Sequence, residues 1–539
     1  MHLVRLLAAA SLMVAPPAAS YAQETVPPAP DFARVVDEGT NRSQVMVLAQ
    51  HMTDVIGPRL TNSPQMRTAE DWAVAKFAEW GLANARKEGF DFGRGWSIER
   101  SSVRMMTPRA LQLTAIPIAW TPATQGTLTA PVIVAPLSKR EHFAAWRGKL
   151  GGRIVMISAP GATVRERTDA PFKRLTGEDI AKLDTFEEPR HDPARNARMQ
   201  AALTFEEELD AFLKAEGALA FARMSYRDNK LLHGEGYLHR TGASLPGVEI
   251  AAEDYRRLAR LAASGTPPTL EIVSDVSFHD GNAEAYNILA DIPGTDRAAG
   301  YVMAGAHYDS WVAGDGAVDN AAGSAMVMEA ARILKAMGVR PKRTIRFALW
   351  NGEEQGLYGS IAYIERNLAR RPAPAARENA LQTYVNQTQR YPVTPLAGYR
   401  DLAAYFNIDN GSGRLRGIHA ENNAAAVPKL REWLSPFAPM GSGAVVFGET
   451  GGTDHQFMAA LGLPAFQFVQ DPLDYNSTTH HSSADTFDHL VPADMRQGAM
   501  VLAWMLLQAA NADAPLPRNP LPRQPLPTNP FATPDPNAE

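Results

Sequence analysis

The sequence contains no cysteine among its 539 residues, which excludes disulfide bonds and a lipidated cysteine near the N-terminus. Its formal net charge of −5 is too close to neutral to indicate a nucleic-acid partner. The apolar run at residues 6–15 is about ten residues long, roughly half of what a bilayer span requires, so a membrane anchor is the weaker alternative. Stability must come from buried apolar area, and the chain is long enough for two or three cores.

The first 22 residues have the pattern of a secretory signal peptide. Arg5 precedes the apolar run, and Ser20-Tyr21-Ala22 supplies small residues at both positions that define a cleavage site. We therefore predict cleavage after Ala22 and export to the periplasm or the extracellular space. The mature protein is expected to have no membrane span.

Both ends of the mature chain are rich in proline and lack apolar periodicity. Residues 23–41 combine Pro with Ala, and residues 513–539 repeat Pro-Leu-Pro and Asn-Pro units. These compositions predict disordered ends. An alternative function for the tail is to bind an aromatic groove of a partner.

Between these ends, the sequence predicts one domain interrupted by another. Apolar residues have helical spacing at 43–56 and 68–82, and short β-rich runs bounded by Gly or Pro follow. Further along, strands alternate with helices, which favours an α/β fold with a doubly wound, mostly parallel sheet. We assign residues 42–117 and 276–512 to this α/β domain and residues 118–275 to an inserted β-rich domain.

His, Asp and Glu residues follow the predicted strands of the α/β domain, at the edge where functional groups of such sheets collect. Each has an ordinary explanation alone, since aspartates cap helices and paired glutamates form solvated faces. Together they form a cluster without Lys or Arg, which repels itself unless cations fill it. Such ligands suit Zn²⁺, and a bridging carboxylate suits two ions ~3.5 Å apart. The residues are His307, Asp309, Asp319, Glu353, Glu354, Asp409, His480 and His481.

These residues stand in motifs that resemble the co-catalytic di-zinc aminopeptidase family of clan MH, with carboxypeptidase Q and glutamate carboxypeptidase II among its members. In order and spacing, the motifs are His-x-Asp, Asp-Asn-Ala-Ala-Gly, Asn-Gly-Glu-Glu-Gln-Gly, the strand-end Asp409, Gly-Thr-Asp-His and His-Ser-Ser-Ala-Asp-Thr. The resemblance extends from about residue 43 to residue 512. The inserted domain is similar to the protease-associated domain that some members carry.

The resemblance implies a zinc-dependent exopeptidase, an aminopeptidase or dipeptidase, that acts on peptides and carries two Zn²⁺ per chain. Asp319 is then expected to bridge both ions. His307 and Asp409 would complete the coordination of one ion, and Glu354 and His481 that of the other.

Two further roles follow from the same resemblance. Glu353 would be the general base that takes a proton from the metal-bridging water as it attacks the scissile carbonyl. Asp309 would orient the ring of His307 through its other nitrogen.

The pair of adjacent histidines is assigned by spacing. The family's ligand stands four residues before an Asp-Thr pair, which here begins at Asp485, so His481 is the predicted ligand and His480 its neighbour. The segment 451–455, which includes Asp454, and Tyr475 are expected to line the substrate site. Tyr475 would stabilise the oxyanion, or alternatively be a packed core tyrosine.

Two other functions remain as alternatives. A glutaminyl cyclase-like acyl transferase has a similar fold but uses a single zinc, and an intact His307 and Asp319 weigh against it. A non-catalytic binding protein of this fold would usually have lost ligands, and this chain has lost none. The inserted domain has no comparable cluster, so we expect it to limit access to the site, with a simple spacer as the alternative. The sequence carries no signal for an oligomeric state.

Overall fold

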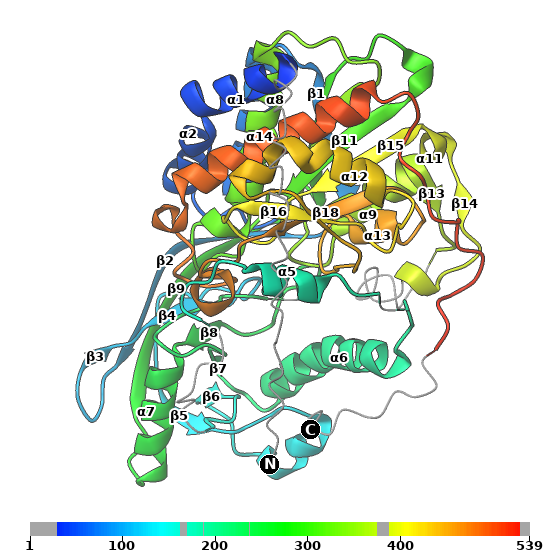
Figure 1. Ribbon diagram of the computed structural model, residues 1–539. Helices are drawn as coiled ribbons and strands as arrows, with labels where there is room; N and C mark the ends of the chain where they lie inside the picture. Colours follow the sequence, from blue (N-terminus) through cyan, green and yellow to red (C-terminus); the bar gives the residue numbers. More distant parts are fainter. Residues whose placement is uncertain (1–29, 162–169, 187, 237, 374–386, 529–539) are drawn as a thin grey trace, which may run out of the picture.

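The computed structural model describes residues 30–161, 170–186, 188–236, 238–373 and 387–528. Two eight-stranded sheets organise them into two domains (Figure 1). The predicted signal peptide and residues 23–29 lie outside the described residues. Among the described helices, none is both long and apolar enough to cross a membrane.

The first sheet forms the α/β domain. Its central strands β12, β11, β15 and β18 are mutually parallel, while β1, β10 and β16 pair antiparallel with a neighbour. The predicted α/β class is confirmed, with a parallel centre and mixed edges. Across the sheet the strands are β1 (Ala83–Asp91), β10 (Glu284–Ile292), β12 (Thr344–Trp350), β11 (Tyr301–His307), β15 (Leu402–Asn407), β18 (Ala465–Gln470), β16 (Leu415–His419) and β17 (Ala444–Val446).

Helices cover both faces of this sheet because successive side chains of a strand point to opposite sides. In β11, Val302 and Ala304 join the larger core and Met303 joins the smaller one. The larger core contains residues of α1 (Pro30–Asn41), α2 (Val45–Gln50), α3 (Pro64–Glu79), α8 (Ala322–Ala336), α12 (Val427–Leu434) and α14 (Pro492–Asn511). The smaller core contains residues of α9 (Tyr358–Tyr363) and α13 (Gln456–Ala459), with α11 (Ala397–Asp401) packed against it.

The second sheet forms the inserted domain. Helix α7 (Ala252–Ala263) packs on one core of this domain, and α4 (Phe143–Trp146) and α6 (Pro193–Ala215) pack on another. Helix α5 (Gly177–Leu183) lies beside the α/β domain, where the carboxylate of Asp184, directly after the helix, accepts the Phe447 N–H at 2.7 Å. The strand order is β3 (Leu111–Gln112), β2 (Gly95–Met105), β9 (Thr269–His279), β5 (Thr127–Val134), β6 (Ile154–Met156), β7 (Ala220–Met224), β8 (Gly247–Ile250) and β4 (Ala115–Pro117).

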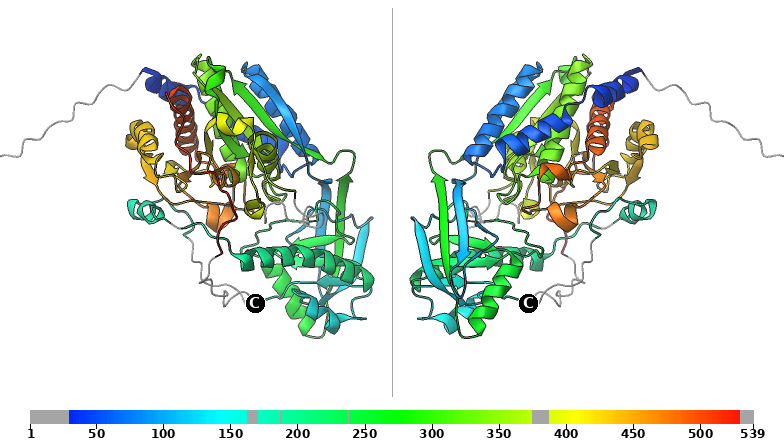
Figure 2. Two further views of the ribbon diagram at one scale, coloured as in Figure 1. Left: turned by 90° about the vertical axis from the view of Figure 1, so that its right-hand side faces the viewer. Right: turned by 90° about the vertical axis from the view of Figure 1, so that its left-hand side faces the viewer.

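The inserted domain begins earlier than predicted. Strand β2 pairs with β9 from Gly95 opposite His279 to Met105 opposite Leu270, so residues 95–117 belong to the inserted sheet and not to the α/β domain. The two connections run side by side, since the Phe92 N–H donates to the Ala283 carbonyl at 3.0 Å. Strands β2 and β9 extend from this junction away from the α/β domain (Figure 2).

The prediction of disordered ends is wrong for the described parts of both ends. Residues 30–41 form α1, because Phe32 is buried against Phe437 and Trp504 at ring distances of 5.0 and 5.3 Å. The tail is described to residue 528 and lies on the α/β domain, where Leu516 is only 3% exposed. Arg518 donates to the carbonyl of Leu402 at 2.6 Å. Burial by distant parts of the chain overrides the proline-rich composition.

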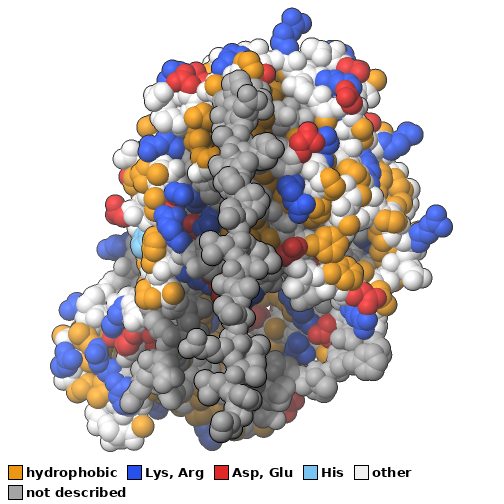
Figure 3. Space-filling view, viewed as in Figure 1, with side chains coloured by type: hydrophobic (Ala, Val, Ile, Leu, Met, Phe, Trp, Pro, Cys, Tyr) orange, Lys and Arg blue, Asp and Glu red, His pale blue; other side chains and the backbone are white. Residues whose placement is uncertain are grey.

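Charges of both signs are mixed on the face that Figure 3 shows, where coloured Lys and Arg atoms alternate with Asp, Glu and hydrophobic side chains. This mixture accords with the small net charge of −5. The charged side chains Asp309, Asp319 and Asp409 near the strand ends are buried.

Candidate metal centre

The carboxyl ends of the parallel strands bring the predicted site residues together. His307 is the last residue of β11, and the loop from β11 to α8 carries Asp319. Glu353 and Glu354 follow β12, and Asp409 follows β15. His481 comes from the loop after β18. Because parallel strands all end at one edge, residues far apart in sequence meet there.

One half of the cluster is formed by His307, Asp319 and Asp409. His307 Nε2 lies 3.1 Å from Asp319 Oδ1 and 3.2 Å from Asp409 Oδ1. All three side chains are buried, and His307 is 1% exposed. Glu353 also belongs to this half. His307, Glu353 and Asp409 each offer one possible ligand atom, and these three atoms lie within 4.8 Å of one another.

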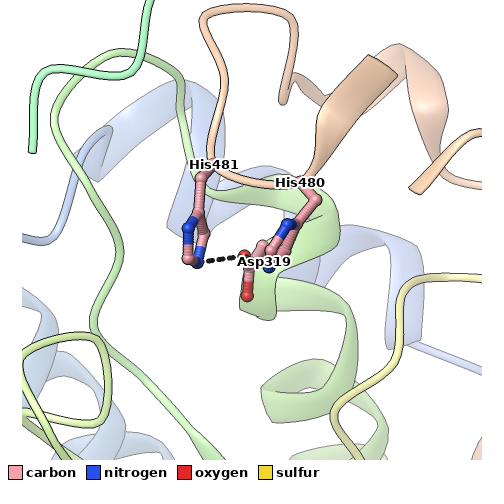
Figure 4. A group of neighbouring side chains, drawn as sticks. All are labelled: Asp319, His480 and His481. Atoms are coloured by element: carbon pink, nitrogen blue, oxygen red, sulfur yellow. Dashed lines mark ion pairs between the residues drawn. The ribbon is translucent and has the colours of Figure 1, made fainter. Parts of the chain in front are cut away.

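The other half is formed by His481, Asp319 and Glu354. His481 Nε2 lies 2.9 Å from Glu354 Oε2 and 3.3 Å from Asp319 Oδ2. Figure 4 shows the rings of His480 and His481 on either side of the Asp319 carboxylate. His480 Nε2 is farther from Asp319 Oδ2, at 3.9 Å, and no ion pair joins it to Glu354 among the described residues. His481 is therefore closer to Asp319 than His480 is, and the choice of His481 as the ligand remains a prediction.

The donor set fits divalent cations. Asp319 turns Oδ1 toward one half and Oδ2 toward the other, and Oδ2 is buried without a hydrogen-bond partner among the described residues. Burial raises the pKa of Glu354 to about 7, against the lowering effect of His481. Burial alone would lower the pKa of His481, but Glu354 and Asp319 raise it to about 9. Bound protons thus neutralise part of the negative charge of the crowded carboxylates. Bound cations would neutralise the same charge.

Asp309 contacts the cluster through both its backbone and its side chain. The His307 Nδ1 hydrogen bond is made with the backbone carbonyl of Asp309 at 3.0 Å, whereas the Asp309 carboxylate is 3.8 Å away. The carboxylate instead accepts the N–H groups of Glu353 and Glu354, both at 3.2 Å. Asp309 therefore holds one ring through its backbone and the Glu353–Glu354 turn through its side chain.

Asp485 and Arg59 hold the backbone of the loop that carries Asp319. Neither residue was predicted to have this role. Asp485 accepts the N–H groups of Val318 at 2.6 Å and Asp319 at 3.0 Å, which fixes the loop that carries Asp319. Arg59 is fully buried and donates to the carbonyl of Gly316 at 2.7 Å. The position of Asp485 four residues after His481 was used only as a landmark, and nothing in the sequence around Arg59 indicated this contact.

The other expected lining residues lie close to the cluster. Asp454 is buried, and burial raises its pKa to about 7. His455 pairs with Glu421 at 3.1 Å. The ring of Tyr475 contacts His480 at a centroid distance of 4.7 Å. A pocket opens on the site and is lined by residues that include Trp311, Asp319, Glu354, His481 and Asp485.

The inserted domain also contributes a side chain that the sequence did not indicate. The ring of His233 stacks on His481, with centroids 5.1 Å apart and planes 12° apart. His233 stands outside the strand-end motifs, so no sequence pattern indicated this contact.

This arrangement of buried imidazoles and carboxylates on an α/β sheet defines a metal-dependent hydrolase. Residues 287–505 match the model of peptidase family M28. Together with the relatives described below, this match identifies the chain as a metallo-exopeptidase.

Relatives of known sequence cover most of the chain. Carboxypeptidase Q of Rattus norvegicus is 23% identical over 474 residues, which cover 87% of this chain and 85% of the relative. Carboxypeptidase Q of Xenopus laevis is 37% identical over 274 residues, 51% of this chain and 52% of the relative.

Solved structures with the same fold also span both domains. A peptidase M28 precursor from Shewanella amazonensis superposes with a TM-score of 0.63 at 22% identity, covering 91% of this chain and 98% of that one. A zinc aminopeptidase from Bacillus subtilis superposes with a TM-score of 0.55 at 17% identity, covering 87% of this chain and 95% of that one.

Proposed function

We propose that the chain is an exported exopeptidase that holds two Zn²⁺ and shortens peptides from a free end, as an aminopeptidase or dipeptidase. The observation that carries this proposal is the position of Asp319, whose two oxygens face two separate ligand groups. His307 and Asp409 form one group, and Glu354 and His481 form the other. The zinc aminopeptidase and carboxypeptidase Q relatives support the choice of metal and reaction.

The chemistry follows from the position of Glu353. Zn²⁺, when bound, polarises the scissile carbonyl and makes water acidic near neutral pH. Glu353 accepts the proton of the attacking water and returns it to the leaving amine. Burial raises the pKa of Glu353 well above its ordinary value, against the lowering effect of His307. The Asp309 carboxylate accepts the backbone N–H of Glu353 and so holds Glu353 in place.

Contacts between the inserted domain and the rim of the site support the proposal that the site accepts only small substrates. Lys173 and Leu473 exchange two backbone hydrogen bonds of 2.7 and 2.8 Å. Ser477 donates to the carbonyl of Pro171 at 2.9 Å. These contacts fasten the inserted domain to the chain just before His481, at the rim of the site. A folded protein would have to displace them, whereas a short peptide would not.

We expect a peptide library to be shortened from one free end. The measurement is mass spectrometry of the digest over time, which also shows whether residues leave from the amino or the carboxyl end. Peptides blocked at that end and folded proteins should remain intact. Cuts inside denatured casein would refute the exopeptidase proposal, and no cleavage of any peptide would favour a binding protein.

We expect close to two Zn²⁺ per chain and loss of activity on chelation, because the two ligand groups share Asp319. Elemental analysis of the purified protein, combined with activity during stepwise zinc return, measures both. Full activity with one ion per chain would sink the two-zinc proposal and favour the cyclase-like alternative.

A further inference from the structure

The inserted domain touches the loop that carries His481 through the short segment Leu232–Glu235. The Leu232 N–H donates to Ser483 Oγ at 3.1 Å, and the Ser483 N–H donates to the Leu232 carbonyl at 2.8 Å. Ser483 is two residues after His481. The inserted domain is therefore hydrogen-bonded directly to the ligand loop.

The ring of His481 contacts an imidazole from each domain. His480 stacks at a centroid distance of 3.8 Å, and His233 of the inserted domain stacks at 5.1 Å with planes 12° apart. Trp311 and Tyr226 pack edge-on against His233, at 5.8 and 5.2 Å. His233 is only 5% exposed. Its ring has little freedom to move away from His481.

Neighbouring carboxylates fix His233 at two points. Its Nδ1 lies 3.0 Å from Glu235 Oε2, and its backbone N–H donates to Glu249 Oε1 at 2.6 Å. Glu249 also accepts the N–H of Gly234 at 3.2 Å. Both the ring and the backbone of His233 are thus held within the inserted domain.

The backbone of His481 needs such support. Its φ of 48° lies in the left-handed region, which is unfavourable for residues with a β-carbon and persists only where the surroundings impose it. Groups that orient a metal-ligating histidine typically change metal affinity by about 10- to 100-fold.

We propose that His233, oriented by Glu235, is a positioning residue for the metal ligand His481. The inserted domain thereby helps to assemble the His481–Glu354 half of the centre, in addition to limiting access. This inference rests on the proposed function, in which His481 binds zinc. It assigns no contact with substrate to His233.

The test compares zinc affinity in three variants of the full chain. His233→Ala removes the stacked ring. The double variant His233→Phe with Glu235→Gln keeps an aromatic ring and removes the charge that would be left unpaired. His239→Ala is the matched control, because His239 is a buried histidine of the inserted domain that stacks on Phe92 at 4.6 Å. The readouts are zinc competition with a chelator, the visible spectrum of the Co²⁺-loaded protein and thermal unfolding.

We expect His233→Ala to weaken one of the two metal sites by about 10-fold and to change the Co²⁺ spectrum. The double variant and His239→Ala should stay within about threefold of the parent protein. Unchanged affinity in His233→Ala would overturn the inference, as would equal losses in His233→Ala and either of the other variants. If His481→Ala itself left both zinc affinities unchanged, the proposed function would fail instead.

Discussion

Replacing Glu353 by Gln should lower kcat by a factor of roughly 10² to 10⁴, the usual worth of a general base, with zinc content and folding unchanged. The amide keeps the size of the side chain but cannot accept the proton of the attacking water. The Glu353 N–H that bonds to Asp309 belongs to the backbone and is preserved. The measurements are steady-state kinetics on a short peptide and elemental analysis of the same sample.

Glu354→Gln is the matched control, because it makes the same chemical change one residue along the chain. Glu354 Oε2 lies 2.9 Å from His481 Nε2, so its loss should reduce zinc affinity, and added zinc should restore part of the activity. Glu353→Gln would then lose activity because the base is missing, and Glu354→Gln because zinc binds less tightly. Near-normal kcat in Glu353→Gln would remove Glu353 from the role of base.

The second large effect is expected for Asp319→Ala, which should leave less than one zinc per chain. Asp319 is the residue with one oxygen toward His307 and the other toward His481, so its loss affects both halves. Because metal ions stabilise transition-state charge by several kcal/mol, kcat/KM should fall by at least about 10³-fold. Zinc content and peptide hydrolysis measure the two outcomes.

Asp315→Asn provides the control for this loop. Asp315 is four residues earlier, and its carboxylate is not among the possible metal-ligating groups of the described residues. It should retain zinc and most activity. Retention of two zinc ions in Asp319→Ala would show that Asp319 does not bridge them.

The strand ends of the α/β domain could be predicted because their signal is local. Strands such as Thr344–Trp350 are short apolar runs, and the structure has β12 at the same residues. Parallel strands must end at a common edge, so the order of strands and motifs was sufficient to bring His307, Asp319, Asp409 and Glu354 near one another. No knowledge of side-chain contacts was required for that step.

The errors have a common physical cause, which is burial by distant segments. The composition of residues 30–41 predicts disorder, but Phe32 and Val35 enter a core built from other helices. The start of the inserted domain was misplaced because β2 is recognised only by its pairing with β9, far along the chain. Periodicity within a segment contains no information on such partners.

By itself, the sequence determined the α/β class, the family resemblance and the set of strand-end residues. The tertiary structure decided how those residues face one another. It placed His481 closer than His480 to Asp319, and it directed the Asp309 carboxylate toward two backbone N–H groups. It also brought His233 of the inserted domain onto the ligand loop. Spacing along a chain fixes which residues reach an edge, but contacts between domains depend on packing that no local pattern encodes.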